Sequence, residues 1–178
     1  DKPDSQEICF IPQGDYRQFL RQNVVPQPRE MVDIHGHKIA DHPGIEFFTV
    51  GQRRGLGVAT RERNFVIRVE PTTRRVVIGT EKDLLQNQVD ISKVNYVSGT
   101  PPPTSVPVTA KIRYGATAVP AKLHPKGETA ILDFENPQRA ITPGQAAVFY
   151  QGDLLVGGGF IEQGELRTCC LLYTSDAA

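Results

Sequence analysis

The sequence is poor in three features that would narrow its function at once: an excess of one charge, a long apolar run and paired cysteines. Its 20 Lys plus Arg are balanced by 20 Asp plus Glu, so no global field attracts nucleic acid, and any RNA contact must come from a local patch. No stretch approaches the roughly 20 apolar residues of a membrane span, and no signal-peptide core opens the chain. We therefore expect no membrane partner and a cytoplasmic location.

Cysteine is scarce, because Cys9 is the only one before Cys169 and Cys170. A lone thiol cannot form a disulfide with the body of the domain, so Cys9 is either a small core residue or a reactive sulfur. Its apolar neighbours favour the core residue when only the local sequence is considered, whereas the prolines and the glycine around it are typical of a loop. The adjacent pair Cys169 and Cys170 has no second pair and lacks zinc spacing.

A short helix and a small sheet are predicted next. Asp15, with Gln18 three residues later, forms a capping-box pattern, and Asn23 and Pro26 end the helix. So short a helix does not hold alone, and we expect it to dock on the sheet that follows. Apolar alternation and turn residues, including the hairpin signal at residues 35–37, predict strands over 31–34, 38–40, 47–50, 65–70 and 74–78.

The second half of the chain has the pattern of a compact barrel. Apolar and polar residues alternate from Val108 to Tyr114, which predicts a half-buried strand with Lys111 and Arg113 on its outer face. Further short strands are predicted over 130–134, 146–150 and 154–161, separated by Gly and Pro turns. The predicted fold class is mainly β: a small central antiparallel sheet domain with one short helix, followed by a C-terminal β-barrel.

Two further patterns suggest ligands but lack the spacing that binding needs. The segment from Gly51 to Gly57 is neither a P-loop nor a GxGxxG motif. An exposed turn carrying Arg53 and Arg54 is the simpler interpretation, with contact to a phosphate backbone as a second use. The second pattern is a possible group of metal ligands, consisting of His35, His37, His42 and Asp41. Alternation across a tight turn directs such side chains away from one another, so we predict no metal site.

The segment DSQEICFIP around Cys9 resembles the one that carries the second active-site cysteine of tRNA-specific 2-thiouridylases, which place sulfur on the wobble uridine of certain tRNAs. Further blocks resemble this family in the same order and spacing, and together they cover about residues 1–164. They are FFTVGQRRGLGV from Phe47, VIGTEKDLL from Val77, AKIRY from Ala110 and TPGQAAVFYQGDLLVGGGFI from Thr142.

The resemblance implies a role for Cys9 as a persulfide that receives sulfur from a donor protein. Its terminal sulfur would attack the activated C2 of uridine or be released as sulfide, and an upstream cysteine, absent here, would resolve the link through a disulfide. ATP, which adenylates the uridine oxygen, would bind in an N-terminal domain that this chain lacks.

The resemblance also aligns Arg113, Tyr114 and Gln145 with positions that contact tRNA. The residue types suit RNA, because a cation meets phosphate and an aromatic ring stacks on a base. A solvated cation beside a core aromatic, and a turn residue at Gln145, are the alternatives. Gly115 and Ala116 stand where the family commonly has a basic and a polar residue, which implies a weaker grip on RNA.

The predicted organisation is that of a C-terminal fragment, since the chain opens without an initiator Met. Residues 1–13 are expected to end the catalytic domain, 14–85 to form the central domain and 86–164 the β-barrel. Residues 165–178 are expected to be a non-native tail, because the end of the chain resembles a translated sequencing adapter. The alternatives are a non-catalytic RNA- or protein-binding β module with a structural Cys9, and a flavin or nucleotide enzyme that uses the glycine-rich turn.

Overall fold

The computed structural model describes residues 16–58 and 63–162. The chain divides between Gly79 and Thr80 into two compact units, each with its own sheet and its own apolar core. No helix within the described ranges is long and apolar enough to cross a membrane. The expectations for Cys9, for the helix cap at Asp15 and for Cys169 and Cys170 lie outside these residues.

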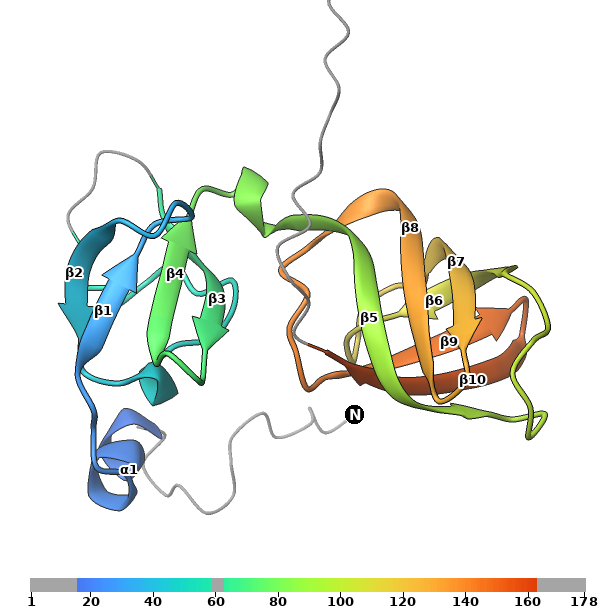
Figure 1. The fold of residues 1–178 in the computed structure, drawn as a ribbon, viewed down its shortest axis with the longest axis horizontal. Helices are drawn as coiled ribbons and strands as arrows, with labels where there is room; N and C mark the ends of the chain where they lie inside the picture. The colour runs from blue at the N-terminus through green and yellow to red at the C-terminus, as the bar shows by residue number, and fades with distance from the viewer. Residues whose placement is uncertain (1–15, 59–62, 163–178) are drawn as a thin grey trace, which may run out of the picture. The chain divides into compact units, whose positions relative to one another are not determined.

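The first unit has one short helix and a four-stranded sheet (Figure 1). Its elements are α1 (Tyr16–Asn23), β1 (Arg29–Val32), β2 (Lys38–His42), the 3-10 helix η1 (Ile45–Phe47), β3 (Phe65–Glu70) and β4 (Arg75–Gly79). The strand order is β2-β1-β4-β3, and β1 pairs with β2, and β3 with β4, in antiparallel fashion. The inner pair, β1 and β4, is parallel. The sheet is therefore mixed rather than purely antiparallel, because two antiparallel hairpins lie side by side with their inner strands running the same way.

The helix and the first hairpin are confirmed. In the turn between β1 and β2, the Asp33 carboxylate accepts hydrogen bonds from the backbone N–H groups of His35 and His37, each at 2.8 Å. Gly36 takes a φ of 88°, which only glycine adopts readily. Helix α1 lies beside η1.

The predicted strand over residues 47–50 is wrong. The 3-10 helix η1 ends at Phe47, no strand is assigned to residues 48–50, and the Phe48 N–H donates to the carbonyl of Ile45 at 3.1 Å. The Phe47 side chain is nevertheless buried. A local turn thus provides backbone hydrogen bonds and still buries an aromatic ring. The apolar run therefore does not require pairing with a neighbouring strand. The core of this unit consists of Met31, Leu56, Val66, Val76 and Ile78.

The second unit is a closed six-stranded barrel, which confirms the predicted fold class (Figure 1). Its elements are the 3-10 helix η2 (Lys82–Leu84), β5 (Leu85–Tyr96), β6 (Val106–Lys111), β7 (Val119–Lys126), β8 (Thr129–Arg139), β9 (Ala146–Gln151) and β10 (Leu154–Ile161). They close in the order β10-β5-β8-β7-β6-β9, and each neighbouring pair is antiparallel.

Two barrel strands, β5 and β7, have no counterpart among the predicted strands. In β5 the buried face passes from Ile91 to Tyr96 across Lys93, whose φ of 48° breaks the alternation. In β7 two prolines, Pro120 and Pro125, argue against a strand on sequence grounds. The predicted strand to Tyr114 ends earlier, since β6 stops at Lys111.

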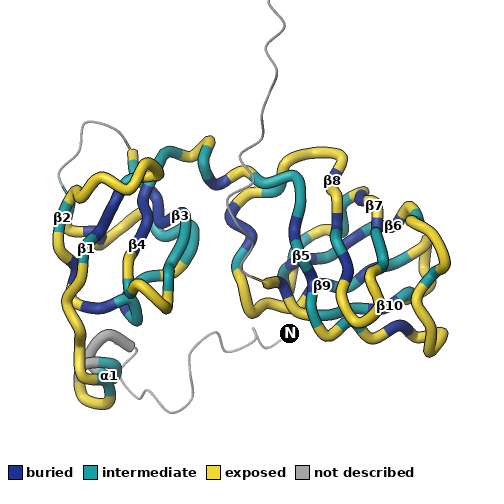
Figure 2. The backbone as a smooth tube through the Cα atoms, viewed as in Figure 1, coloured by how far each residue is buried: buried dark blue, intermediate teal, exposed yellow. Residues whose placement is uncertain are grey.

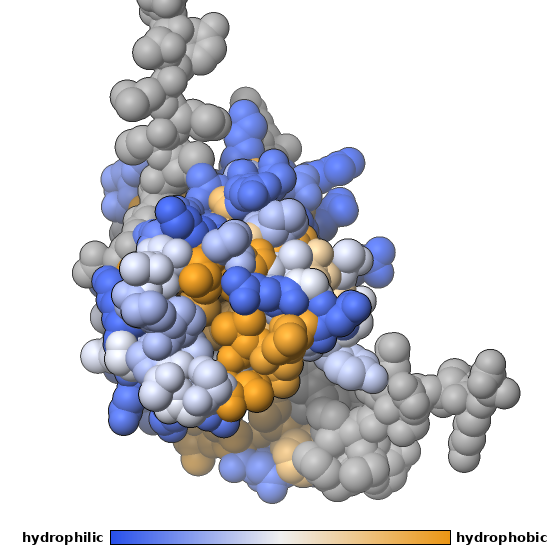
Figure 3. Space-filling model, turned by 90° about the vertical axis from the view of Figure 1, so that its right-hand side faces the viewer, coloured by the Kyte–Doolittle hydropathy of each residue, from blue (hydrophilic) through white to orange (hydrophobic). Residues whose placement is uncertain are grey.

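Inward-facing side chains fill the barrel, and Figure 2 shows buried positions alternating with intermediate or exposed ones along its strands. Apolar side chains also gather on the surface displayed in Figure 3. Exposed apolar residues of this unit include Val97, with 65% of its surface accessible, and Leu154, with 70%. The Val97 N–H donates to the Val156 carbonyl at 3.1 Å, which places Val97 beside the start of β10.

Candidate nucleic-acid interface

Tyr114 projects from a tight turn just beyond the end of β6. The Ala116 N–H donates to the Arg113 carbonyl at 3.3 Å, and Gly115 adopts a φ of 74°. The Tyr114 side chain is 99% exposed, so the ring is not the core aromatic of the alternative interpretation. An aromatic ring held out into solvent at the rim of a barrel is available for stacking on a base.

Arg113 does not point outward beside Lys111, as the predicted strand required. Its guanidinium Nη2 donates to the backbone carbonyl of Arg139, and to that of Ala140 at 2.5 Å. Ala140 itself has a φ of 52°, and its N–H donates to the Leu84 carbonyl at 2.9 Å. The guanidinium therefore fastens the turn of Tyr114 to the loop that follows β8, and no signal in the sequence indicated these two acceptors.

Gln145 lies at the end of that same loop, directly before β9. Its side chain is exposed, and its N–H donates to the Thr142 carbonyl at 3.4 Å in a turn where Gly144 has a φ of 82°. The Ile161 N–H donates to the Gln145 carbonyl at 2.8 Å. The turn is thus tied to β10 through its backbone. The side-chain amide of Gln145 faces solvent.

Strand register brings Tyr114 and Gln145 to the same end of the barrel. Strands β6 and β9 are antiparallel, with Lys111 opposite Val148 at the last pair. Tyr114 lies three residues beyond Lys111, the last residue of β6, and Gln145 directly precedes Ala146, the first residue of β9. The three predicted contact residues therefore lie at one end of the barrel, where Arg113 is bonded to the carbonyls of Arg139 and Ala140.

The glycine-rich turn at residues 51–57 is irregular backbone, with no helix or strand assigned within it. Arg53 and Arg54 are exposed, as the simpler interpretation of the sequence predicts.

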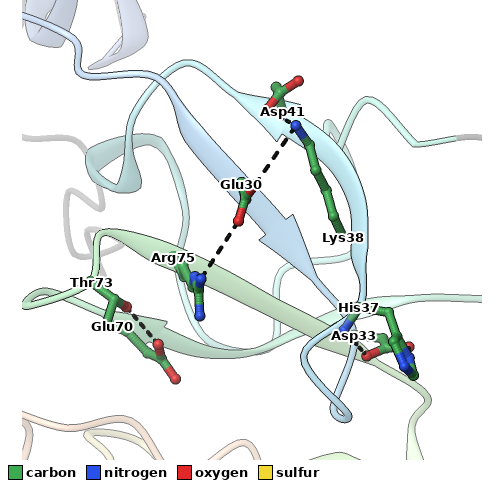
Figure 4. Close-up of polar contacts among 8 residues, drawn as sticks. All are labelled: Glu30, Asp33, His37, Lys38, Asp41, Glu70, Thr73 and Arg75. Carbon is green, nitrogen blue, oxygen red and sulfur yellow. Dashed lines mark hydrogen bonds and ion pairs between the residues drawn. The ribbon is translucent and has the colours of Figure 1, made fainter.

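Charged residues on β1, β2 and β4 form a network that neutralises itself (Figure 4). Register places Glu30 opposite Asp41, a repulsive pair of carboxylates. Lys38 Nζ lies 2.9 Å from Asp41 and 3.9 Å from Glu30, and Arg75 lies 3.6 Å from Glu30 on the other side. The hydrogen bond to Asp41, and the charge of that carboxylate, raise the pKa of Lys38. These cations offset the repulsion between the Glu30 and Asp41 carboxylates, so their charge is already balanced within the sheet.

The histidines considered as metal ligands do not form one group, because the His35 and His37 rings lie 6.1 Å apart between centroids whereas His42 is at the other end of β2. His42 is 2% exposed and packs edge-on against the Phe48 ring, whereas His37 is exposed and its Nδ1 lies 3.0 Å from Asp33. Burial lowers the pKa of His42. Among residues 16–58 and 63–162, no group of three or more His, Cys, Asp or Glu side chains could hold a metal ion.

Comparison with known families divides the chain much as the two units do. A family model described as a tRNA methyl transferase PRC-barrel domain matches residues 17–80, and one described as an aminomethyltransferase beta-barrel domain matches residues 86–161.

Comparison with individual proteins gives one recurring function. A tRNA-specific 2-thiouridylase MnmA of Acidithiobacillus ferrooxidans is 44% identical over 168 residues, which is 92% of this chain and 48% of that protein. Those of Moorella thermoacetica, 44% identical over 90% of this chain and 46% of the relative, and Gloeothece citriformis, 41% identical over 92% and 47%, are similar. The chain spans about half the length of the curated relatives it matches.

Proposed function

The chain belongs to the tRNA-specific 2-thiouridylase family, and we propose that its full-length protein forms 2-thiouridine at the wobble position of tRNA in an ATP-dependent reaction. The observation that carries the proposal is the 44% identity over 92% of the chain. Supporting it, the rim of the barrel presents an exposed ring at Tyr114 and an exposed amide at Gln145, side chains suited to RNA. We place this enzyme in the cytoplasm.

In the proposed reaction Cys9 carries the sulfur. A donor protein passes a sulfane sulfur to the Cys9 thiolate and departs as its own thiol. The terminal sulfur of the Cys9 persulfide then attacks C2 of uridine and displaces the activated oxygen. A second cysteine, outside this chain, attacks the Cys9 sulfur, so that the S–S bond breaks and the sulfur remains on C2. The resulting disulfide is reduced by a thiol reductant before the next cycle.

ATP supplies the activation that makes the C2 oxygen a leaving group. Because the family resemblance implies an N-terminal ATP-binding domain, we assign ATP binding to the part of the full-length protein outside residues 1–178.

Arg113, Tyr114 and Gln145 form the proposed tRNA surface of the barrel, with unequal tasks. Tyr114 offers its ring to a base, and Gln145 offers both a donor and an acceptor. The Arg113 guanidinium is already bonded to two carbonyls. Its proposed contribution is to hold the turn of Tyr114 in place, so that less conformational freedom is lost when RNA binds.

Cys9→Ser in the full-length protein tests the assignment. A hydroxyl carries no transferable sulfur, so 2-thiouridine formation, measured by nucleoside analysis of the tRNA product, should fall below detection. Melting temperature and tRNA affinity should stay close to those of the wild type. Retained 2-thiouridine would exclude Cys9 as the sulfur carrier. A loss of tRNA binding together with activity would instead point to a structural Cys9.

A further inference from the structure

The segment from Gly51 to Leu56, here named the arginine turn, is anchored at both ends in the first unit. The Gly51 N–H donates to the Val66 carbonyl at 2.7 Å, and the Val66 N–H donates to the Gln52 carbonyl at 2.9 Å. At the other end the Leu56 side chain is buried in the core of the unit. Between these anchors the chain must turn outward, and Arg53 and Arg54 occupy its exposed part.

The Gln52 side chain holds the turn from within. Its Oε1 accepts from the Thr49 N–H at 3.0 Å, and its Nε2 donates to the Arg54 carbonyl at 3.0 Å. Gly51 and Gly55 adopt φ values of 85° and 73°, which a residue with a Cβ takes at a cost. The backbone that presents the two arginines is therefore formed before any ligand arrives.

Four other cations of the first unit are already paired with carboxylates. Lys38, Arg68, Arg74 and Arg75 each lie within 4.0 Å of a carboxylate. A phosphate approaching Lys38, for example, would also meet the charge of Asp41 at 2.9 Å from the ammonium. By contrast, neither the Arg53 nor the Arg54 guanidinium has a carboxylate partner within the described part of the chain.

We propose that the arginine turn binds the phosphodiester backbone of RNA, as a second contact surface in the unit that lacks Tyr114. Because the sequence has no net charge, binding to a polyanion depends on cations that are not internally paired. Guanidinium groups match phosphate oxygens in a bidentate manner, and two at adjacent positions on a preformed turn lose little freedom on binding. The inference rests on the proposed function, since it takes tRNA as the ligand.

The double variant Arg53→Ala/Arg54→Ala tests it in the 178-residue chain, with Lys122→Ala/Lys126→Ala on the barrel strand β7 as the control. Both variants remove two exposed positive charges, so their net charge is the same. Affinity for an unmodified tRNA transcript with uridine at the wobble position is measured between 50 and 200 mM salt. Losing two phosphate contacts should make the affinity fall about tenfold less over this range than in the wild type.

The outcomes separate this inference from the proposed function. The expected result is a shallower salt dependence for the arginine variant alone, with wild-type melting temperatures in both variants. If both variants change alike, the effect is one of net charge, and the inference is wrong. If the wild type binds tRNA and the arginine variant binds it identically, the turn serves another partner, such as an acidic protein, and the inference fails alone. If the wild type does not bind the transcript, the tRNA surface of the proposed function fails with it.

Discussion

At the scale of single residues, exposure distinguishes Tyr114 from other aromatic side chains of the barrel. Phe149 and Phe134 are buried, and Tyr96 is 6% exposed, whereas Tyr114 is 99% exposed. Burying an aromatic ring is favourable and exposing one stabilises nothing, so this ring has no structural use in the isolated chain. That makes it the residue whose removal separates binding from folding most cleanly.

Tyr114→Ala should therefore weaken tRNA binding without lowering stability. If a base stacks on the ring, its loss should cost about 1–3 kcal/mol of binding free energy, measured by titration with unmodified tRNA. Tyr114→Phe is the matched control, because it keeps the stacking face and removes only the hydroxyl. An alanine variant with unchanged affinity would show that the ring does not contact tRNA. A clearly lowered melting temperature would show that the ring has a structural role.

At the scale of elements, the sequence predicted the hairpins but did not predict where strand pairing is interrupted by a bulge or a turn. The turn at His35 and the strand over Phe65–Glu70 follow from turn residues and alternation within a few positions. Strand β5 was missed, because the bulge at Lys93 shifts its buried face from one parity to the other. The run at residues 47–50 looked like a strand, but its local turn already satisfies the backbone.

Closure of the barrel depends on the glycines of β10, and this predicts a strong effect of a single methyl group. A Cβ at Gly159 would lie 2.5 Å from the Ser92 carbonyl oxygen and 2.7 Å from the Ile91 Cγ2. Because β5 must then move away, Gly159→Ala should lower the free energy of unfolding by about 1–3 kcal/mol, measured by urea denaturation of the chain.

Leu154→Ala is the control on the same strand, since Leu154 is 70% exposed. Its effect should remain within about 0.5 kcal/mol of the wild type. A Gly159→Ala variant as stable as this control would mean that β5 and β10 tolerate a wider separation than the structure indicates.

At the scale of the whole molecule, binding and chemistry are expected to separate. The proposed tRNA surface and the arginine turn lie within residues 1–178, whereas ATP binding and the second cysteine are assigned outside them. The chain matches 48% of the length of its Acidithiobacillus ferrooxidans relative, which leaves room for both in a full-length protein.

The 178-residue chain should therefore bind tRNA but form no 2-thiouridine when ATP, tRNA and a sulfur donor are supplied. The measurement is nucleoside analysis of the recovered tRNA, with a full-length family member as the positive control. Detectable 2-thiouridine from the purified chain would show that the activation site lies within these residues, and the assignment of ATP binding would be wrong.

The sequence by itself determined the hairpins, the mainly β class and the family, because these depend on turn residues, alternation and ordered motifs that lie close together along the chain. It also singled out Tyr114 and Gln145. Only the tertiary structure decided the parallel pairing of β1 with β4, the bonds of Arg113 to the Arg139 and Ala140 carbonyls, and the pairing of Lys38. Strand register or loop packing brings the residues of each of these contacts together, and the local sequence does not indicate this.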